Sequence, residues 1–181
     1  MKKLFLLSTA AFATAALLSY SYKRPEPKPL TPECYISCFN AEARDSIQLD
    51  ANKPGFASWH LYPKKIVFDN PLGKMIQFKA TDGTNAQGYF IAAKKKTNKW
   101  LFVIQEWWGL NDNIKNEADK YYSALGDVNV LALDMYDGKV AAIADSAMVY
   151  MRNAKADRLE SIVKAAIAYA GTNAKIYTVG W

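Results

Sequence analysis

Hydrophobic and polar residues alternate over two neighbouring stretches in the middle of the chain. In residues 75–80 every second position from Ile76 onward is apolar, and the pattern resumes in residues 86–92. Alternation with a period of two is typical of a strand that buries one face. Because Asp82 and Gly83 lie between the two stretches and favour a tight turn, the pattern predicts a β-hairpin.

Three later stretches are apolar without alternation, as expected for strands covered on both faces of a sheet. They are Trp100–Ile104, Val128–Leu133 and Lys175–Val179. Such runs are typical of a sheet with helices on both sides. We therefore predict three buried strands, the first of them central in the sheet.

Apolar residues at helical spacing separate these runs. The first helix is predicted to start at a cap residue, Asn111 or Asp112, and to end at Gly126. A strong helical pattern covers residues 159–170, and a weaker one covers residues 140–151. The helices thus fall between the strands, in the order that βαβ units require.

This order of elements predicts an α/β fold with a mostly parallel sheet, an N-terminal β-hairpin and flanking helices. The 181 residues are 51% hydrophobic and 22% charged, which is a globular composition with room for one ordinary domain. No repeat of solenoid period is evident.

The N-terminus has the pattern of a secretory signal. Met1-Lys2-Lys3 is followed by an apolar stretch from Leu4 to Leu18 that Ser8, Thr9 and Thr14 interrupt. The stretch is shorter than the roughly 20 residues that span a bilayer, so we expect no stable membrane span. We predict a signal peptide over residues 1–21 and export to the periplasm or outside the cell. Anchoring by an uncleaved N-terminal segment is the alternative.

Prolines mark the next segment and its boundary. All seven prolines of the chain lie between residues 22 and 71, where periodic apolar positions are few. Residues 22–71 are therefore interpreted as an extension or tether, and the folded domain is predicted to cover residues 72–181.

The charge pattern argues against a nucleic-acid partner. The net charge is +6, but the lysines are scattered, and the run Lys94–Lys96 lies between two predicted strands without aromatic residues interleaved for base stacking. This run is interpreted as a solvated turn.

The cysteines and the histidine do not form a recognisable site. Cys34 and Cys38 are free or paired with each other, and the sequence leaves both options open. Two cysteines supply too few ligands for a metal, and His60 lies far from them in a segment without periodicity. We therefore expect no metal site and no cofactor.

The first place to look for chemistry is the segment after Trp100–Ile104. Ligands of α/β sheets bind beyond the carboxyl ends of parallel strands, and here the sequence continues as Gln105-Glu106-Trp107-Trp108-Gly109-Leu110-Asn111. The motif V-I-Q-E-W-W-G-L-N, followed by a helix and then L-A-L-D-M-Y, resembles the dienelactone hydrolase family. The resemblance runs from about Gly73 to Trp181 and implies an incomplete α/β-hydrolase fold.

The resemblance also implies roles for three residues. At the position of Glu106 the family has a carboxylate that contacts the catalytic thiol and helps to produce the reactive thiolate. The backbone N–H of Trp107 is assigned to the oxyanion hole, and Trp108 is expected to line the substrate pocket. The implied partner is a small ester or lactone, although paired tryptophans are bulky for a small lactone. The alternative without a catalytic role is that Glu106 is a solvated carboxylate and the two tryptophans are structural.

The end of the sequence bears on activity. The family's nucleophile elbow has the pattern G-x-C-x-G after a strand, and Val179-Gly180-Trp181 supplies only the strand end, the first glycine and the next residue. The acid and the histidine of the triad follow the nucleophile in chain order, and His60 precedes the whole sheet. We therefore expect a fragment of a hydrolase that is inactive alone.

Two classes of function follow from this sequence. One is an exported hydrolase of ester or lactone bonds, and the other is a non-catalytic binding module on an α/β-hydrolase scaffold. The sequence leaves the natural substrate and the oligomeric state open.

Overall fold

The computed structural model describes Gly55 and residues 62–180. These residues form one sheet and the helices around it. In chain order the elements are β1 (Lys74–Lys79), β2 (Asn85–Ile91), β3 (Lys99–Ile104), α4 (Asp112–Leu125), β4 (Asn129–Leu133), α5 (Ala144–Asn153), α6 (Ala156–Ala170) and β5 (Lys175–Gly180). The predicted alternation of strands and helices is confirmed.

The sheet has five strands in the order β1-β2-β4-β3-β5 among the described residues. β1 and β2 form the predicted antiparallel hairpin, and β2 also runs antiparallel to β4. β3 lies between β4 and β5 and runs parallel to both. The sheet is therefore mixed, with three parallel strands joined to an antiparallel hairpin, and the α/β class is confirmed.

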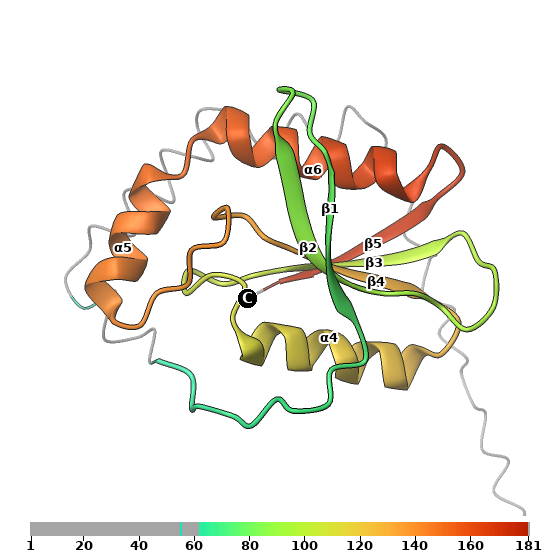
Figure 1. The fold of residues 1–181 in the computed structure, drawn as a ribbon, viewed down its shortest axis with the longest axis horizontal. Helices are drawn as coiled ribbons and strands as arrows, with labels where there is room; N and C mark the ends of the chain where they lie inside the picture. Colours follow the sequence, from blue (N-terminus) through green and yellow to red (C-terminus); the bar gives the residue numbers. More distant parts are fainter. Residues whose placement is uncertain (1–54, 56–61, 181) are drawn as a thin grey trace, which may run out of the picture.

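Helices cover both faces of the sheet (Figure 1). α6 packs on one face through a cluster that includes Phe102, Leu131 and Ile162, each at most 1% exposed. α4 packs on the other face through a second cluster, which includes Val103 and Ile114. Successive residues of one strand thus contribute to opposite layers, because strand side chains alternate between faces. This explains why Trp100–Ile104 is apolar at every position.

α4 begins and ends where the sequence predicts. Asn111 is the N-cap, and its Oδ1 accepts a hydrogen bond of 3.0 Å from the backbone N–H of Ile114. Gly126 is the C-cap, and its N–H donates to the carbonyl of Tyr122 at 3.1 Å. Asn111 rather than Asp112 is therefore the cap, which settles the alternative that the sequence left open.

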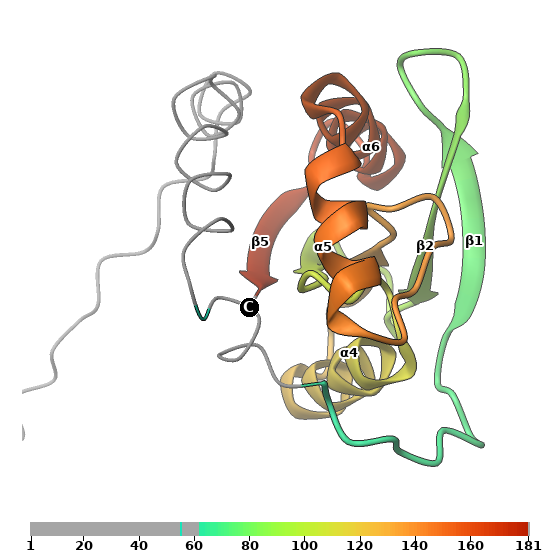
Figure 2. The ribbon, with the colours of Figure 1, turned by 90° about the vertical axis from the view of Figure 1, so that its left-hand side faces the viewer.

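β5 differs from its prediction as a buried strand. It lies at one edge of the sheet, opposite β1 (Figure 2), and it pairs with β3 alone among the described strands. Tyr177 is 46% exposed, and none of the residues of β5 is buried. An apolar run predicts a strand, but its burial depends on what packs beside it, and only one neighbouring strand does so here.

α5 is shorter than the helix predicted over residues 140–151. It starts at Ala144, and the two apolar residues that extended the prediction, Val140 and Ile143, are 44% and 59% exposed. The backbone N–H of Ala141 donates instead to the carbonyl of Trp108 at 2.9 Å. This bond holds residues 140–143 in a loop against the turn that follows β3.

Residues 62–73 form neither helix nor strand, yet they pack on the domain. Phe68 meets the ring of Tyr89 edge to face at 6.0 Å. The N–H of Leu72 donates to Asp119 Oδ2 at 3.1 Å, and the N–H of Gly73 donates to the Tyr89 hydroxyl at 2.7 Å. The domain boundary near residue 72 stays a prediction. Within the described part of the chain, no helix has the length and apolar character needed to cross a membrane.

Candidate functional site

The predicted site lies in the turn between β3 and α4. It follows the carboxyl end of β3, on the side of the sheet where α5 also lies (Figure 1). The N–H of Gly109 donates to the carbonyl of Glu106 at 3.2 Å, which closes a tight turn over the two tryptophans. Gly109 has φ +93°, a conformation that residues with a Cβ rarely adopt, so this glycine is required by the turn.

Close packing against the next loop adds a second reason for glycine at this position. A Cβ on Gly109 would lie 2.4 Å from the carbonyl oxygen of Lys139. The turn after β3 and the loop after β4 are therefore in direct backbone contact.

Both tryptophans of the turn are buried. Trp107 is 6% exposed and Trp108 is 2% exposed, and their ring centroids lie 5.0 Å apart. They form a cluster with Ala141 and with Ala147 of α5, and Tyr62 meets Trp108 edge to face at 4.7 Å. This cluster fixes the turn, so the tryptophans at least hold the backbone around Glu106 in place. The pocket role of Trp108 stays a prediction.

Glu106 stands between a buried strand and this cluster. It is partly exposed, in contrast to the buried residues on either side of it, Gln105 and Trp107. In the register of the parallel pair, Ile104 lies opposite Gly180 at the ends of β3 and β5. Glu106 follows Ile104 by two residues, so it is located at the carboxyl ends of the parallel strands, near the end of β5.

The loop after β4 is organised by the buried carboxylate of Asp134. Asp134 is 3% exposed, and its Oδ2 accepts from Gln87 Nε2 at 2.7 Å and from the N–H of Gly138 at 2.6 Å. Its Oδ1 accepts from the N–H of Tyr136 at 3.1 Å. One carboxylate thus ties this loop to itself and to β2.

Gln105 connects the two loops. Its side chain is 7% exposed, and its Oε1 accepts from the N–H of Met135 at 3.2 Å. The bond between Ala141 N–H and the Trp108 carbonyl adds a second link. The backbone around Glu106 is therefore held from both ends by the loop after β4.

Three buried donors around Glu106 lack a hydrogen-bond partner within the described residues. They are Gln105 Nε2, Trp108 Nε1 and Asn111 Nδ2. Buried polar groups are normally hydrogen-bonded, and an unsatisfied donor costs roughly 1–3 kcal/mol. Their gathering on one turn marks this part of the protein as different from the loop after β4.

Tyr136 in the loop after β4 and Arg158 of α6, which donates to Asp137 of that loop, both have a shifted pKa. Burial raises the pKa of Tyr136 to about 12. The hydrogen bonds that Arg158 donates to Asp137, and then to Asp82, raise the pKa of its guanidinium above the ordinary value. The described residues contain no cluster of three or more His, Cys, Asp or Glu side chains placed to hold a metal.

The sequence selects the turn after β3 as the candidate site, which stays a prediction, and it does not identify the residues that hold this turn in place. Asp134 was recognised only as the end of a strand, and Gln105 only as part of the motif. The available signal for Asp134 was a carboxylate directly after a buried strand, followed by Gly138 in a turn. The two cysteines Cys34 and Cys38, His60 and Trp181 lie outside the described residues.

Comparisons with known proteins agree with this picture. Residues 87–181 match the model of the dienelactone hydrolase family. The protein named usf of Aquifex pyrophilus is 34% identical over 104 residues, which cover 54% of this chain and 43% of the relative. A protein of Aquifex aeolicus (strain VF5) named as a carboxymethylenebutenolidase is 32% identical over 106 residues, with the same 54% and 43% coverage.

A crystal structure assigned as a dienelactone hydrolase, from Klebsiella pneumoniae subsp. pneumoniae, superimposes on 60% of this chain and 50% of its own, with a TM-score of 0.49 and 13% identity. The chain spans less than half the length of the curated relatives that it matches. The family model nevertheless covers more than half of the chain, from within β2 to the end of β5, including the whole turn around Glu106. The chain therefore belongs to the dienelactone hydrolase family.

Proposed function

We propose that this chain forms the N-terminal part of a hydrolase of ester or lactone bonds. Its reacting centre lies where the carboxyl ends of β3 and β5 are side by side. The observation that carries the proposal is the parallel register that sets Ile104 opposite Gly180. Glu106 follows one of these residues and Trp181 follows the other. A nucleophile directly after Trp181 would then emerge beside Glu106.

Glu106 is the proposed activator of this nucleophile. A thiol attacks a carbonyl as the thiolate, so a carboxylate that contacts it and accepts its proton raises the reactive fraction. The partial exposure of Glu106, next to buried neighbours, suits a group that must meet both a thiol and a substrate. The proton would pass from sulfur to the carboxylate before attack.

Trp107 would act through its backbone. Attack on an ester converts the planar carbonyl into a tetrahedral centre with a negative oxygen, and a fixed N–H stabilises that charge. A tight turn that closes from Gly109 N–H to the Glu106 carbonyl fixes the peptide plane before Trp107. Such preorganisation is what an oxyanion hole requires, and Trp108 is proposed to shape the adjoining substrate pocket.

The exposed strand β5 supports a further part of the proposal. An edge strand with half-exposed apolar residues is open to pairing with another strand. We propose that polypeptide following Trp181 covers this edge and supplies the nucleophile, the acid and the histidine. On this proposal residues 1–181 alone do not turn over substrate.

The first test is to read the coding sequence beyond Trp181. We expect Cys, or Ser, then any residue, then Gly, which would complete the elbow pattern. A verified stop directly after Trp181 would remove the nucleophile from the proposal and leave the binding-module alternative.

The second test measures hydrolysis of p-nitrophenyl acetate by the protein that includes this downstream segment. Glu106→Gln is expected to lower kcat/KM by about 10²-fold or more, the scale of a lost proton-transfer group. Glu117→Gln is the matched control, because Glu117 is a carboxylate on α4 that pairs with Lys120 at the surface. Equal rates in the wild type and both variants would exclude Glu106 from the mechanism.

We further propose that the protein is exported, on the basis of the signal pattern in residues 1–21, which lie outside the described residues. N-terminal sequencing of the mature protein tests this. The first residue is expected near Ser21, and an intact Met1 in a cytoplasmic fraction would contradict export.

A further inference from the structure

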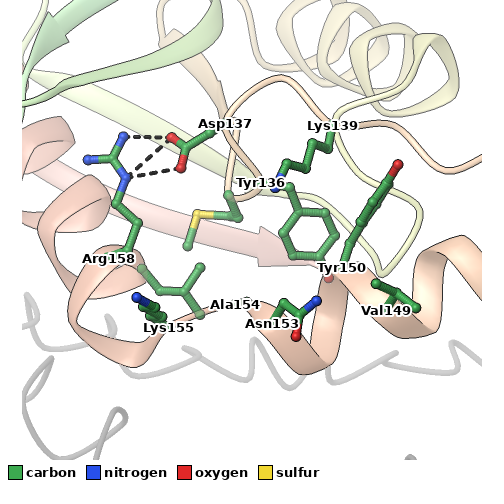
Figure 3. A pocket seen from close by; sticks show the side chains of 11 residues that line it. Tyr136, Asp137, Lys139, Val149, Tyr150, Asn153, Ala154, Lys155 and Arg158 are labelled. Carbon is green, nitrogen blue, oxygen red and sulfur yellow. Dashed lines mark hydrogen bonds and ion pairs between the residues drawn. The ribbon is translucent and has the colours of Figure 1, made fainter.

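A cavity lies beyond the carboxyl end of β4, between α5 and the start of α6 (Figure 3). It has a volume of about 280 Å³, and none of its lining residues belongs to the turn around Glu106. This volume is near the lower end of the roughly 300–1,000 Å³ of small-molecule sites. The cavity would therefore take a small ligand.

Six of the eleven residues that line this cavity are apolar or aromatic, and the other five, Asp137 among them, are polar or charged. Met135 and Leu159 line it together with Tyr136 and Tyr150, whose ring centroids lie 6.3 Å apart in an edge-to-face arrangement. The Tyr136 phenol is neutral at physiological pH, as tyrosines ordinarily are. These residues offer a surface for the flat or apolar body of a ligand.

Arg158 lines the cavity, but its charge is already compensated. Its Nη2 donates to Asp137 Oδ1 at 2.6 Å and to the Asn85 carbonyl at 2.7 Å, and its Nη1 donates to Asp82 Oδ2 at 3.1 Å. Figure 3 shows the guanidinium turned toward Asp137. Arg158 of α6 therefore links the hairpin to the loop after β4 through hydrogen bonds and ion pairs.

Two lysines at the cavity are not compensated in this way. Lys139 and Lys155 both line it, and neither forms an ion pair with a carboxylate within 4.0 Å among the described residues. Lys139 Nζ lies 5.9 Å from the centroid of the Tyr150 ring. Figure 3 places Lys139 and Lys155 on opposite sides of the cavity.

We propose that this cavity binds a small dicarboxylate whose two carboxylates are separated by an apolar or aromatic body. The two uncompensated ammonium groups would each bind one carboxylate, and the tyrosine rings with Met135 and Leu159 would contact the body between them. Charge-assisted hydrogen bonds of this kind are the stronger class of polar contact. The inference is independent of the hydrolase reaction, because it uses no residue of the turn around Glu106.

The probe for the test is terephthalate, compared with benzoate, which has one carboxylate, and benzamide, which has none. Binding to the full chain is measured by isothermal titration calorimetry at low salt. We expect the Kd of terephthalate to be about fivefold lower than that of benzoate, since exposed ion pairs add modest affinity, and benzamide to bind more weakly than either.

Substitutions of the two lysines then test whether each binds one carboxylate of terephthalate. Lys139→Met and Lys155→Met should each raise the Kd of terephthalate to about the value for benzoate, because either removes one anchor. Lys175→Met, at an exposed lysine that starts β5, is the matched control and should leave the Kd unchanged. The three substitutions lie at exposed positions, and an unchanged melting temperature verifies that each variant is folded.

Three results would overturn the proposal. The first is no heat of binding with terephthalate at about 10 mM, and the second is equal affinity for terephthalate and benzoate. The third is the same loss of affinity in Lys175→Met as in the two cavity variants, which would indicate a general charge effect.

Discussion

The turn after β3 and the loop after β4 are neighbours of similar length, but they satisfy their polar groups in opposite ways. In the loop after β4, the buried carboxylate of Asp134 accepts three hydrogen bonds from nearby donors. The turn after β3 keeps buried donors without partners in the described part of the chain, on Gln105, Trp108 and Asn111. The loop after β4 therefore stabilises itself, and the donors of the turn after β3 are candidates for contacts with another group.

This difference indicates how the site is built. Met135 N–H donates to Gln105 Oε1, and Ala141 N–H donates to the Trp108 carbonyl, so the self-contained loop holds the turn in place. On the proposed function, the loop after β4 provides the position and the turn after β3 provides the reacting groups. This division is consistent with sites in which a supporting layer fixes the reacting groups.

The largest expected effect comes from breaking the self-contained loop. Asp134→Ala leaves the half-buried Gln87 amide and the N–H groups of Tyr136 and Gly138 without their acceptor. A hydrogen bond to a charged group contributes roughly 1.5–3 kcal/mol, so we expect the loss of these three part-buried bonds to lower the free energy of unfolding by about 4 kcal/mol. Urea denaturation measures it. Asp127→Ala, at an exposed aspartate, is the control and should change stability by less than about 0.5 kcal/mol.

A second substitution separates the two loops by steric force. Gly109→Ala puts a Cβ 2.4 Å from the Lys139 carbonyl oxygen at a residue with φ +93°. We expect a loss of about 3 kcal/mol, because both the conformation and the contact are unfavourable. Gly83→Ala isolates the conformational part, since Gly83 has φ +82° with nothing within 4 Å of a Cβ. Equal losses in the two variants would show that the loops do not press on each other.

A third pair of substitutions tests whether the free donor of Asn111 matters for folding. Asn111→Ala removes the cap acceptor of Ile114 N–H and should cost about 1 kcal/mol. Asn111→Asp keeps the acceptor and removes only the unpartnered Nδ2, so its stability should stay within about 0.5 kcal/mol of the wild type. Thermal melting at pH 7 compares them. A larger loss in Asn111→Asp would mean that the amide donor already has a stabilising partner.

The smallest effect at neutral pH is expected from Tyr136→Phe. Burial raises the pKa of Tyr136 to about 12 in the folded protein, above the roughly 10 of an unfolded tyrosine. Its preference for the neutral form is therefore fully present below pH 10 and is lost as the pH rises from 10 toward 12. Tyr136→Phe should match the wild type at pH 7 and lose less stability between pH 10 and 12. Parallel pH profiles would show that the ring is not buried as described.

Local signals in the sequence predict much of the fold. The cap at Asn111 and the stop at Gly126 determine the ends of α4, because both act through bonds within a few residues. The hairpin follows from alternation and a turn signal. The apolar run of β5 does not by itself predict exposure, since exposure depends on which strand lies beside it rather than on its own residues.

The position of the turn after β3 was predictable from the sequence, but the contacts that hold it were not. A motif after a buried strand selects Glu106 as a candidate, and its role stays a prediction. The bond between Gln105 and Met135 joins residues 30 apart in the chain, and it exists only because β3 and β4 run in parallel register. The contact of Tyr62 with Trp108 is also long-range and has no local signal.

On the proposal that polypeptide follows Trp181, the most direct measurement is a crystal structure of that longer protein. The account predicts the side chain of the residue directly after Trp181 within hydrogen-bonding reach of the Glu106 carboxylate, about 3–4 Å away. It also predicts that the Trp107 N–H is directed at the same point. A nucleophilic side chain at the amino ends of the parallel strands, or a Glu106 carboxylate turned away from the nucleophile, would contradict the account.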